Sequence, residues 1–399
     1  MKITDIETIA LSIPHPPGHV WVKGEISATG WDLLVVRVHT DEGISGIGEA
    51  YHLKNPWAVI STIEQSLKPL LIGQDPFDNE QLWAQMFIRT IQLGSAAIGA
   101  IAGVDAALWD IKGKALGLPV YKLLGGANMR EIPLYTGGHV LGYRTLDNLD
   151  DLVKEAERYV KQGYKALKMR GGRGHPERGD IESAKALRKA FGNDIEILVD
   201  VNSEYGDYTT AKRMAREFEP LNLYWLEDPF RFTIHYHNEE TARLSRESNV
   251  PIATGGNVYG RASIKRIVEH GGVDYVMSNV SKAGGLTETR KIITLIETWN
   301  LKYSPHCDGG LNALGNFHLF ASAPPHVTAN VYHEFDPVYP YDQVLTHPPV
   351  IKNGKALLPD RPGLGSDLLE GLEEKYPFQG DTWFIHNRNK SIAGKMKQK

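Results

Sequence analysis

Charged and polar residues close a series of short β-type runs in the second half of the chain. They stand at or next to the last residue of their runs: Lys168, Arg170, Asp200, Asn202, Glu227, Asn279, His306 and Glu334. If these runs are parallel strands of one barrel, their carboxyl ends meet at one mouth, where such barrels carry their functional groups. The side chains are therefore expected to converge.

Asp200 and Glu227 have the chemistry of a cation site. They end adjacent runs, and neighbouring strands lie about 4.8 Å apart, which lets two carboxylates bridge one ion. Carboxylates, together with water and substrate oxygens, suit Mg²⁺. The alternative is that each acid caps a helix or pairs with Lys168 or Arg170, because ion-pair networks resemble such sites.

Lys168 and Arg170 are two positions apart, so strand alternation puts both on one face. Buried charges need partners. The two cations therefore either neutralise Asp200 and Glu227 or hold the carboxylate of a substrate. Lysine can serve as a base, whereas arginine stays protonated and is a better carboxylate clamp.

His306 follows Ser304 and Pro305 at the end of another run, and the run before it ends in Asn279. A side chain bonded to one ring nitrogen fixes the tautomer that the other nitrogen presents. Asparagine, unlike aspartate, cannot stabilise an imidazolium by charge, so His306 is expected to be a weaker base than in a His/Asp pair.

The elements that must position these residues are strands that alternate with helical stretches. Eight β-type runs recur: IPLYTGG (132–138), YKALKMR (164–170), IEILVDVN (195–202), LYWLEDP (223–229), VPIATGG (250–256), VDYVMSN (273–279), LKYSPH (301–306) and VTANVYHE (327–334). Alternating strands and helices predict parallel pairing through right-handed crossovers, and this number of units fits a closed barrel. We therefore predict an α/β chain with a (β/α) barrel over residues 127–335.

Residues 1–126 read as a separate α+β domain. Residues 2–12 alternate in polarity, and 31–50 form two β-rich runs around a turn at 41–43, which predicts an antiparallel sheet. The period then becomes helical, and the last helix is expected to stop at Gly117 and Pro119. The segment 336–399 is rich in Pro and Gly and is expected to fold back onto the first domain.

Composition and charge restrict the class of protein. The 399 residues are 42% hydrophobic and 23% charged, with a net charge of −4, which is typical of a globular chain and gives no electrostatic basis for binding nucleic acid or a membrane surface. A single cysteine, no signal-peptide pattern and no membrane-spanning apolar run predict a cytoplasmic protein. No glycine-rich nucleotide motif occurs.

The motifs together resemble the enolase superfamily, in particular its mandelate racemase-like subgroup. The resemblance covers nearly the whole chain and rests on DEGISGIGEA, VDAALWDIKGKALGLPVYKLLGG, YKALKMR, LVDVN, WLEDP, VPIATGG, AGGLTE, SPH and LPDRPGLG, in the family's order. It implies a capping domain over a modified (β/α)₇β barrel, Mg²⁺, and removal of the proton α to a carboxylate. It also implies a homo-oligomer.

The resemblance assigns roles residue by residue. Asp200 and Glu227 would be metal ligands, Lys168 part of a Lys-x-Lys base motif, His306 the base on the opposite face and Glu334 an electrophilic acid. Loops 15–23 and 51–54 would form a specificity lid. The predicted substrate-binding residues are Trp21, Tyr51, His52, Asn202 and Asn257.

Three positions depart from the family pattern. Gly256 replaces the third metal ligand, Arg170 the second lysine, and Asn279 the aspartate partner of His306. Losing a ligand weakens divalent binding, so Mg²⁺ binding is expected to be weak.

Our leading hypothesis is an acid-sugar dehydratase that acts on a small hydroxy-carboxylate. A binding or scaffold protein derived from such an enzyme is the alternative. A racemase or epimerase is a further one, less favoured because it needs two competent bases.

Overall fold

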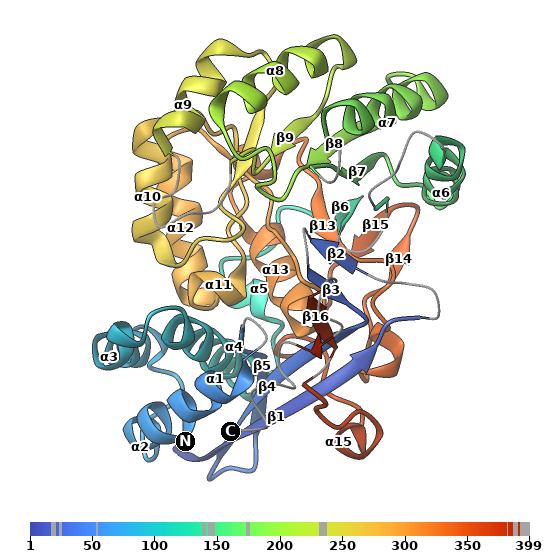
Figure 1. Cartoon of the computed structure of the whole chain (residues 1–399). Helices are drawn as coiled ribbons and strands as arrows, with labels where there is room; N and C mark the ends of the chain where they lie inside the picture. Colours follow the sequence, from blue (N-terminus) through green and yellow to red (C-terminus); the bar gives the residue numbers. More distant parts are fainter. Residues whose placement is uncertain are drawn as a thin grey trace.

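The computed structural model describes residues 1–16, 21–23, 26–52, 55–137, 141–142, 148–172, 176–230, 238–380, 382–385 and 390–391. It has an eight-stranded barrel in one half and a capping domain in the other (Figure 1).

The barrel strands follow one another around the sheet in sequence order. They are β6 (Glu131–Thr136), β7 (Ala166–Arg170), β8 (Glu196–Asp200), β9 (Trp225–Glu227), β10 (Ile252–Thr254), β11 (Tyr275–Val276), β12 (Lys302–Tyr303) and β13 (His333–Phe335). Neighbours from β6 to β12 pair in parallel, and β13 pairs in parallel with β6. Across the remaining seam, Ser304 Oγ donates to the carbonyl of Tyr332 at 2.7 Å.

Helices connect successive strands around the outside of the barrel (Figure 1). They are α6 (Leu149–Lys161), α7 (Pro176–Phe191), α8 (Tyr208–Phe218), α9 (Asn238–Glu247), α10 (Gly260–His270), α11 (Val280–Ala283) with α12 (Leu286–Thr298), and α13 (Gly310–Ser322) with α14 (Pro325–Thr328). The predicted (β/α)₇β barrel is confirmed. The strand predicted over 327–334 was wrong in part, because residues 327–328 belong to α14 and only the end of the run is strand.

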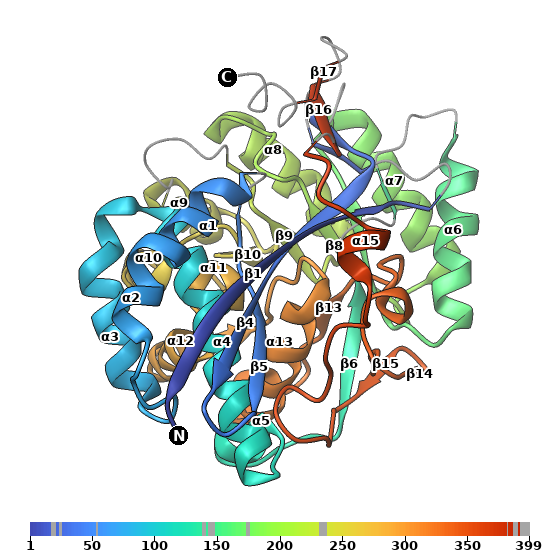
Figure 2. The same cartoon turned by 90° about the horizontal axis from the view of Figure 1, so that it is seen from below.

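The capping domain packs an antiparallel sheet on helices. Its strands are β1 (Ile3–Pro14), β4 (Gly30–Thr40) and β5 (Ser45–Glu49), and its helices are α1 (Pro56–Thr62), α2 (Lys68–Leu71), α3 (Asn79–Thr90), α4 (Ser95–Leu116) and α5 (Val120–Leu123). The sheet lies beside α4 (Figure 2). A Cβ at Gly48 would lie 2.1 Å from the Gly103 carbonyl, so only glycine permits this approach. As predicted, α4 ends at Gly117, whose φ is 65°.

The C-terminal segment contacts both halves of the molecule. Its strands β14 (Ile351–Lys352) and β15 (Lys355–Leu357) extend the barrel sheet next to β6. Further on, after α15 (Leu372–Lys375), β16 (Trp383–Ile385) pairs with β3 (Ile26–Ala28), which in turn pairs with β2 (Trp21–Lys23), and β17 (Lys390–Ser391) lies beyond β16. Arg37 of β4 holds Asp367 at 2.8 Å. The segment thus ties the cap to the barrel.

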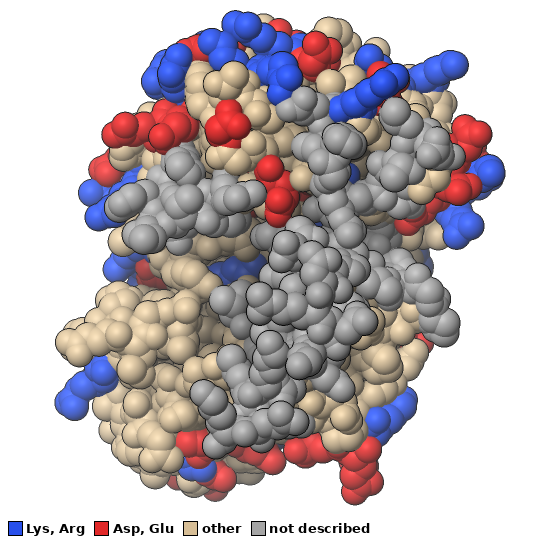
Figure 3. Space-filling model, in the orientation of Figure 1, with Lys and Arg blue, Asp and Glu red and all other residues tan. Residues whose placement is uncertain are grey.

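The surface carries both signs of charge. Lys and Arg are interspersed with Asp and Glu over the barrel helices at the top of Figure 3. None of the helices in the described ranges combines the length and apolar content needed to cross a lipid bilayer.

Candidate active site

The register of the barrel strands brings the predicted residues together. Arg170 pairs with Asp200, and Asp200 pairs with Glu227 across β7, β8 and β9. Alternation puts Lys168 and Arg170 on the same face of β7 as Ala166, which belongs to a buried cluster with Leu198 and Trp225. The charged side chains therefore form the next layers above that apolar cluster, toward the carboxyl ends of the strands.

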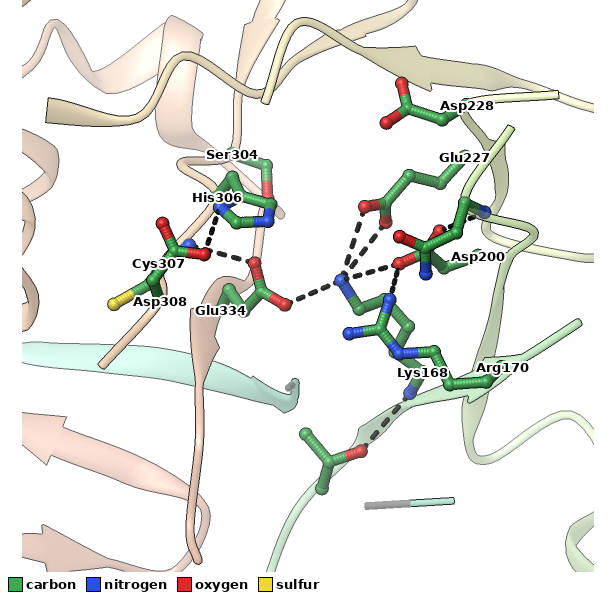
Figure 4. A network of polar contacts seen from close by, with 12 residues as sticks. Lys168, Arg170, Asp200, Glu227, Asp228, Ser304, His306, Cys307, Asp308 and Glu334 are labelled. Atoms are coloured by element: carbon green, nitrogen blue, oxygen red, sulfur yellow. Dashed lines mark hydrogen bonds and ion pairs between the residues drawn. The ribbon is translucent and has the colours of Figure 1, made fainter. Parts of the chain in front are cut away.

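The Lys168 ammonium lies among three carboxylates (Figure 4). Its Nζ is 2.6 Å from Glu334 Oε1, 3.3 Å from Glu227 Oε1 and 3.4 Å from Asp200 Oδ2. The lysine side chain is only 1% exposed. Arg170 also pairs with Asp200. We call Lys168, Arg170, Asp200, Glu227 and Glu334 the Lys168 cluster; when all five are ionised, its two cations and three carboxylates leave one net negative charge.

The two carboxylates nearest the ammonium differ in their electrostatics. Burial raises the pKa of Glu227 to about 7, although Lys168 opposes the shift. Burial would also raise the pKa of Glu334, but the charges of Lys168 and Arg170 outweigh it and lower that pKa below the usual range. Glu334 forms the shorter contact with Lys168, whereas the charges of Glu334 and Asp228 add to the rise in the pKa of Glu227. Glu334 therefore accepts hydrogen bonds in this state, one of them from the Cys307 backbone N–H at 2.9 Å.

Asp200 and Glu227 fit a cation held by two carboxylates. Both meet one positive atom, Lys168 Nζ, within 3.4 Å, so their oxygens converge on a single cationic point. The described residues contain no group of three His, Cys, Asp or Glu side chains arranged to hold a metal. At Gly256, a Cβ would lie 2.9 Å from His306 Cβ and 3.0 Å from its Cγ, so the histidine occupies the room that a ligand side chain would need.

His306 lies across the mouth from β7, after β12. Its Nδ1 is 3.0 Å from Asn279 Nδ2, and its backbone N–H donates to the Met277 carbonyl. Burial, reinforced by the charge of Lys282, lowers the pKa of His306 to about 4, so the ring is uncharged at neutral pH. The second ring nitrogen points away from Asp308, toward the side on which Glu227 and Lys168 lie in Figure 4.

Two site residues escaped the sequence analysis. Asp308 Oδ2 accepts from Asn279 Nδ2 at 2.8 Å and lies 3.4 Å from the Nζ of the buried Lys282. That Nζ also donates to Asn257 Oδ1 at 3.1 Å. The available signal was their position just beyond the strand ends, in SKAGG and SPHCDGG. We call Asn257, Asn279, Lys282, His306 and Asp308 the His306 cluster.

The predicted substrate-binding residues are placed unevenly. Asn202 adopts a positive φ of 47°, and its backbone N–H donates to Asp200 Oδ1. Asn257 Nδ2 donates to Asp228. The Tyr51 ring lies 4.7 Å from Lys282 Nζ, at the edge of the His306 cluster.

The expected lid is described only in part. His52 Nε2 contacts the carbonyl of Asp32, within the cap. The Trp21 side chain and residues 17–20, 24–25 and 53–54 lie outside the described part of the chain.

Comparison with known proteins identifies the family. Residues 151–372 match the enolase C-terminal domain-like family, and residues 15–125 match the N-terminal domain of mandelate racemase and muconate lactonizing enzyme. The chain therefore belongs to the enolase superfamily, in its mandelate racemase-like subgroup, as the motifs indicated.

Several similar proteins carry names that refer to sugar acids. Arabinonate dehydratase of Saccharolobus solfataricus is 34% identical over 86% of this chain and 90% of its own length. A 3,6-anhydro-α-L-galactonate cycloisomerase of Streptomyces coelicolor is 32% identical over 84% and 88%. The solved structure of L-talarate dehydratase from Polaromonas sp. JS666, complexed with Mg and L-glucarate, is similar with a TM-score of 0.79 and 29% identity, covering 94% of this chain and 96% of that one.

Proposed function

We propose that this chain is an acid-sugar dehydratase, a hydro-lyase that removes water from a polyhydroxy carboxylate at the barrel mouth. The observation that carries the proposal is that Lys168 of β7 and His306, which follows β12, both lie near the buried carboxylate of Glu334 at the barrel mouth (Figure 4). The sugar-acid names of the relatives support the substrate class. A cytoplasmic location and a homo-oligomeric state are part of the same proposal.

The reaction removes a proton and a hydroxyl from neighbouring carbons. A nitrogen of Lys168 or His306 takes the proton α to the carboxylate, the bond to the β-hydroxyl breaks, and that hydroxyl leaves as water after protonation. The resulting enol becomes a keto acid. Arg170 is suited to hold the substrate carboxylate, and Asn202, Asn257, Tyr51, His52 and Trp21 are proposed to contact the hydroxyl groups.

Asp200 and Glu227 would hold Mg²⁺, and binding would be weak because the third position is Gly256. When bound, the ion would stabilise negative charge on the substrate carboxylate during proton removal. The Mg in the complex of L-talarate dehydratase supports this assignment. Because the Lys168 ammonium meets the same carboxylates, Mg²⁺ and the protonated lysine compete for them.

The test is to incubate the full chain with sugar acids, including arabinonate and glucarate, in D₂O with excess MgCl₂. We expect exchange of the α-proton and a product lighter by one water. A product that keeps the elements of water and carries deuterium in place of the abstracted hydrogen would indicate a cycloisomerase or racemase instead. Binding of a sugar acid without exchange or product would contradict the dehydratase and favour the scaffold protein.

Lys168→Arg is the sharpest variant. It keeps a cation among the three carboxylates, but a guanidinium does not give up its proton at neutral pH. We expect exchange to fall by about 10²–10⁴-fold if the lysine is the base, with the unfolding midpoint checking that the variant folds. Unchanged exchange would remove Lys168 from the mechanism.

A further inference from the structure

The Asn279 amide has a fixed orientation. Asn279 is the N-cap of α11, and its Oδ1 accepts from the Ser281 backbone N–H at 2.9 Å and from Ser281 Oγ at 2.7 Å. A backbone N–H can only donate, so the atom facing it must be the amide oxygen. The amide nitrogen is therefore the atom that faces Asp308 and His306.

This orientation determines what His306 Nδ1 can do. The Asn279 Nδ2 group has two hydrogens and meets two acceptors, Asp308 Oδ2 at 2.8 Å and His306 Nδ1 at 3.0 Å. An amide NH₂ cannot accept, so Nδ1 must be the unprotonated nitrogen. In an uncharged imidazole, the single proton then lies on Nε2.

Asp308 does not reverse this choice. Its nearer oxygen is 3.7 Å from His306 Nδ1, too far for a hydrogen bond, whereas its other oxygen is held by Asn279 and Lys282. Lys282 also opposes a charged ring, since two cations would lie close together. The carboxylate of Asp308 therefore orients the Asn279 amide and does not form a hydrogen bond with the imidazole.

We infer that Asn279 is a positioning residue that holds neutral His306 in the Nε2–H tautomer, so that the ring faces the barrel mouth as a hydrogen-bond donor. A nitrogen that carries its proton cannot accept another as a base. A neutral imidazole N–H can instead stabilise negative charge that develops on a substrate oxygen. Within the proposed dehydratase, on which this last step rests, His306 donates to an oxygen, and Lys168 takes the α-proton once its ammonium has lost a proton.

Two other histidines in the chain serve as reference signals, one for each neutral tautomer. His318 Nδ1 accepts from the Tyr121 backbone N–H at 3.3 Å, which puts its proton on Nε2. His333 Nδ1 faces the Glu334 carbonyl at 2.5 Å, which puts its proton on Nδ1. Both rings are buried, and burial lowers both pKa values to about 4.

The experiment is solid-state NMR of the full chain with ¹⁵N-labelled histidine at pH 7. Because the chain has 15 histidines, the signals are assigned by their loss in His306→Gln, His318→Gln and His333→Gln. We expect the His306 pattern to match that of His318. A match with His333, or the pattern of an imidazolium, would overturn the inference.

The matched variant exchanges the two partners, Asn279→Asp with Asp308→Asn. It keeps the net charge and the cap of α11, but the carboxylate now faces Nδ1 and accepts its proton. We expect the His306 pattern to move to that of His333. No change in the pattern would show that Asn279 does not set the tautomer.

Activity gives an independent measurement. Glutamine can donate a hydrogen bond but cannot act as a base, so His306→Gln should keep α-proton exchange within about tenfold, whereas His306→Ala should lose about 10²–10³-fold. Equal losses in both variants would contradict the donor role. If the wild type has no activity but the NMR pattern is as expected, the proposed function fails and the tautomer assignment stands.

Discussion

The Lys168 cluster and the His306 cluster face each other across one barrel mouth, but they are held in different ways. The first consists of charges on strands β7, β8, β9 and β13, paired directly through distances such as 2.6 Å. The second is a hydrogen-bond network on α11 and the segment after β12, with an uncharged ring at its centre. One half of the mouth is organised by charge, and the other half by the direction of donors and acceptors.

This difference shows that departures from a family pattern are not equivalent. Gly256 removes a negative charge, so it acts on cation binding over the Lys168 cluster. Asn279 keeps nearly the same shape as aspartate but exchanges an acceptor for a donor, so it acts on the proton of His306. The first departure therefore bears on the proposed Mg²⁺ site, and the second bears on the hydrogen bond to His306.

The largest effect on stability is expected in the Lys168 cluster. Lys168→Met leaves three buried carboxylates without their common cation and should lower the free energy of unfolding by about 3–5 kcal/mol, measured by urea denaturation at pH 7. Lys282→Met is the control; it removes another buried lysine, for which Asp308 is the one carboxylate contact among the described residues. Excess Mg²⁺ should stabilise Lys168→Met more than the wild type, because the ion no longer competes with the ammonium. Equal losses of unfolding free energy in the two variants would contradict the difference between the two clusters.

A second prediction concerns the His306 cluster and the pH dependence of the free energy of unfolding. An unfolded histidine titrates near about 6.5, whereas the pKa of folded His306 is about 4. Between these values the unfolded state binds more protons, so stability present above pH ~6.5 is lost as pH falls toward ~4. His306→Gln should reduce this loss by up to about 3 kcal/mol.

The measurement is the unfolding free energy of wild type and variant across this range. His318→Gln should act in the same direction, because burial lowers its pKa in the same way. A His306→Gln curve parallel to that of the wild type would mean that folding does not lower the pKa of His306.

A third prediction concerns Gly256, which lies against His306. Gly256→Ala puts a Cβ 2.9 Å from His306 Cβ, and the crowding should cost about 1–3 kcal/mol. Gly315→Ala, in α13, is the matched control. Its Cβ would have only ordinary contacts, with Leu286 Cδ1 at 3.6 Å and Val280 Cγ1 at 3.9 Å. This variant should be neutral or stabilising by up to about 1 kcal/mol. Thermal unfolding distinguishes them. Equal stability of the two variants would show that His306 gives way easily, and that a ligand could be restored at position 256.

The smallest effect is expected at the cap of α11. Ser281→Ala removes the hydroxyl that donates to Asn279 Oδ1 but keeps the backbone N–H, so the amide orientation should persist. The cost should be about 1 kcal/mol, measured by urea denaturation. A larger loss, with a changed His306 tautomer, would mean that the hydroxyl holds the network.

The sequence predicts much of the Lys168 cluster and less of the His306 cluster. Lys168, Asp200 and Glu227 can be inferred because strand alternation and parallel register are local rules that put strand ends side by side. Asp308 and Lys282 lie beyond the strand ends, where no periodicity indicates a direction. Nothing in the local sequence shows that Lys282 reaches Asp308 across the network.

The sequence by itself determined the barrel, the cap and the identity of the three departures, because hydrophobic period, turn residues and motif order are properties of the chain. Only the tertiary structure decided what those departures do. The convergence of three carboxylates on one ammonium, the histidine in the space beside Gly256 and the fixed direction of the Asn279 amide depend on distances between segments far apart in sequence. Such distances are set by packing, and electrostatic and hydrogen-bond energies change over fractions of an ångström.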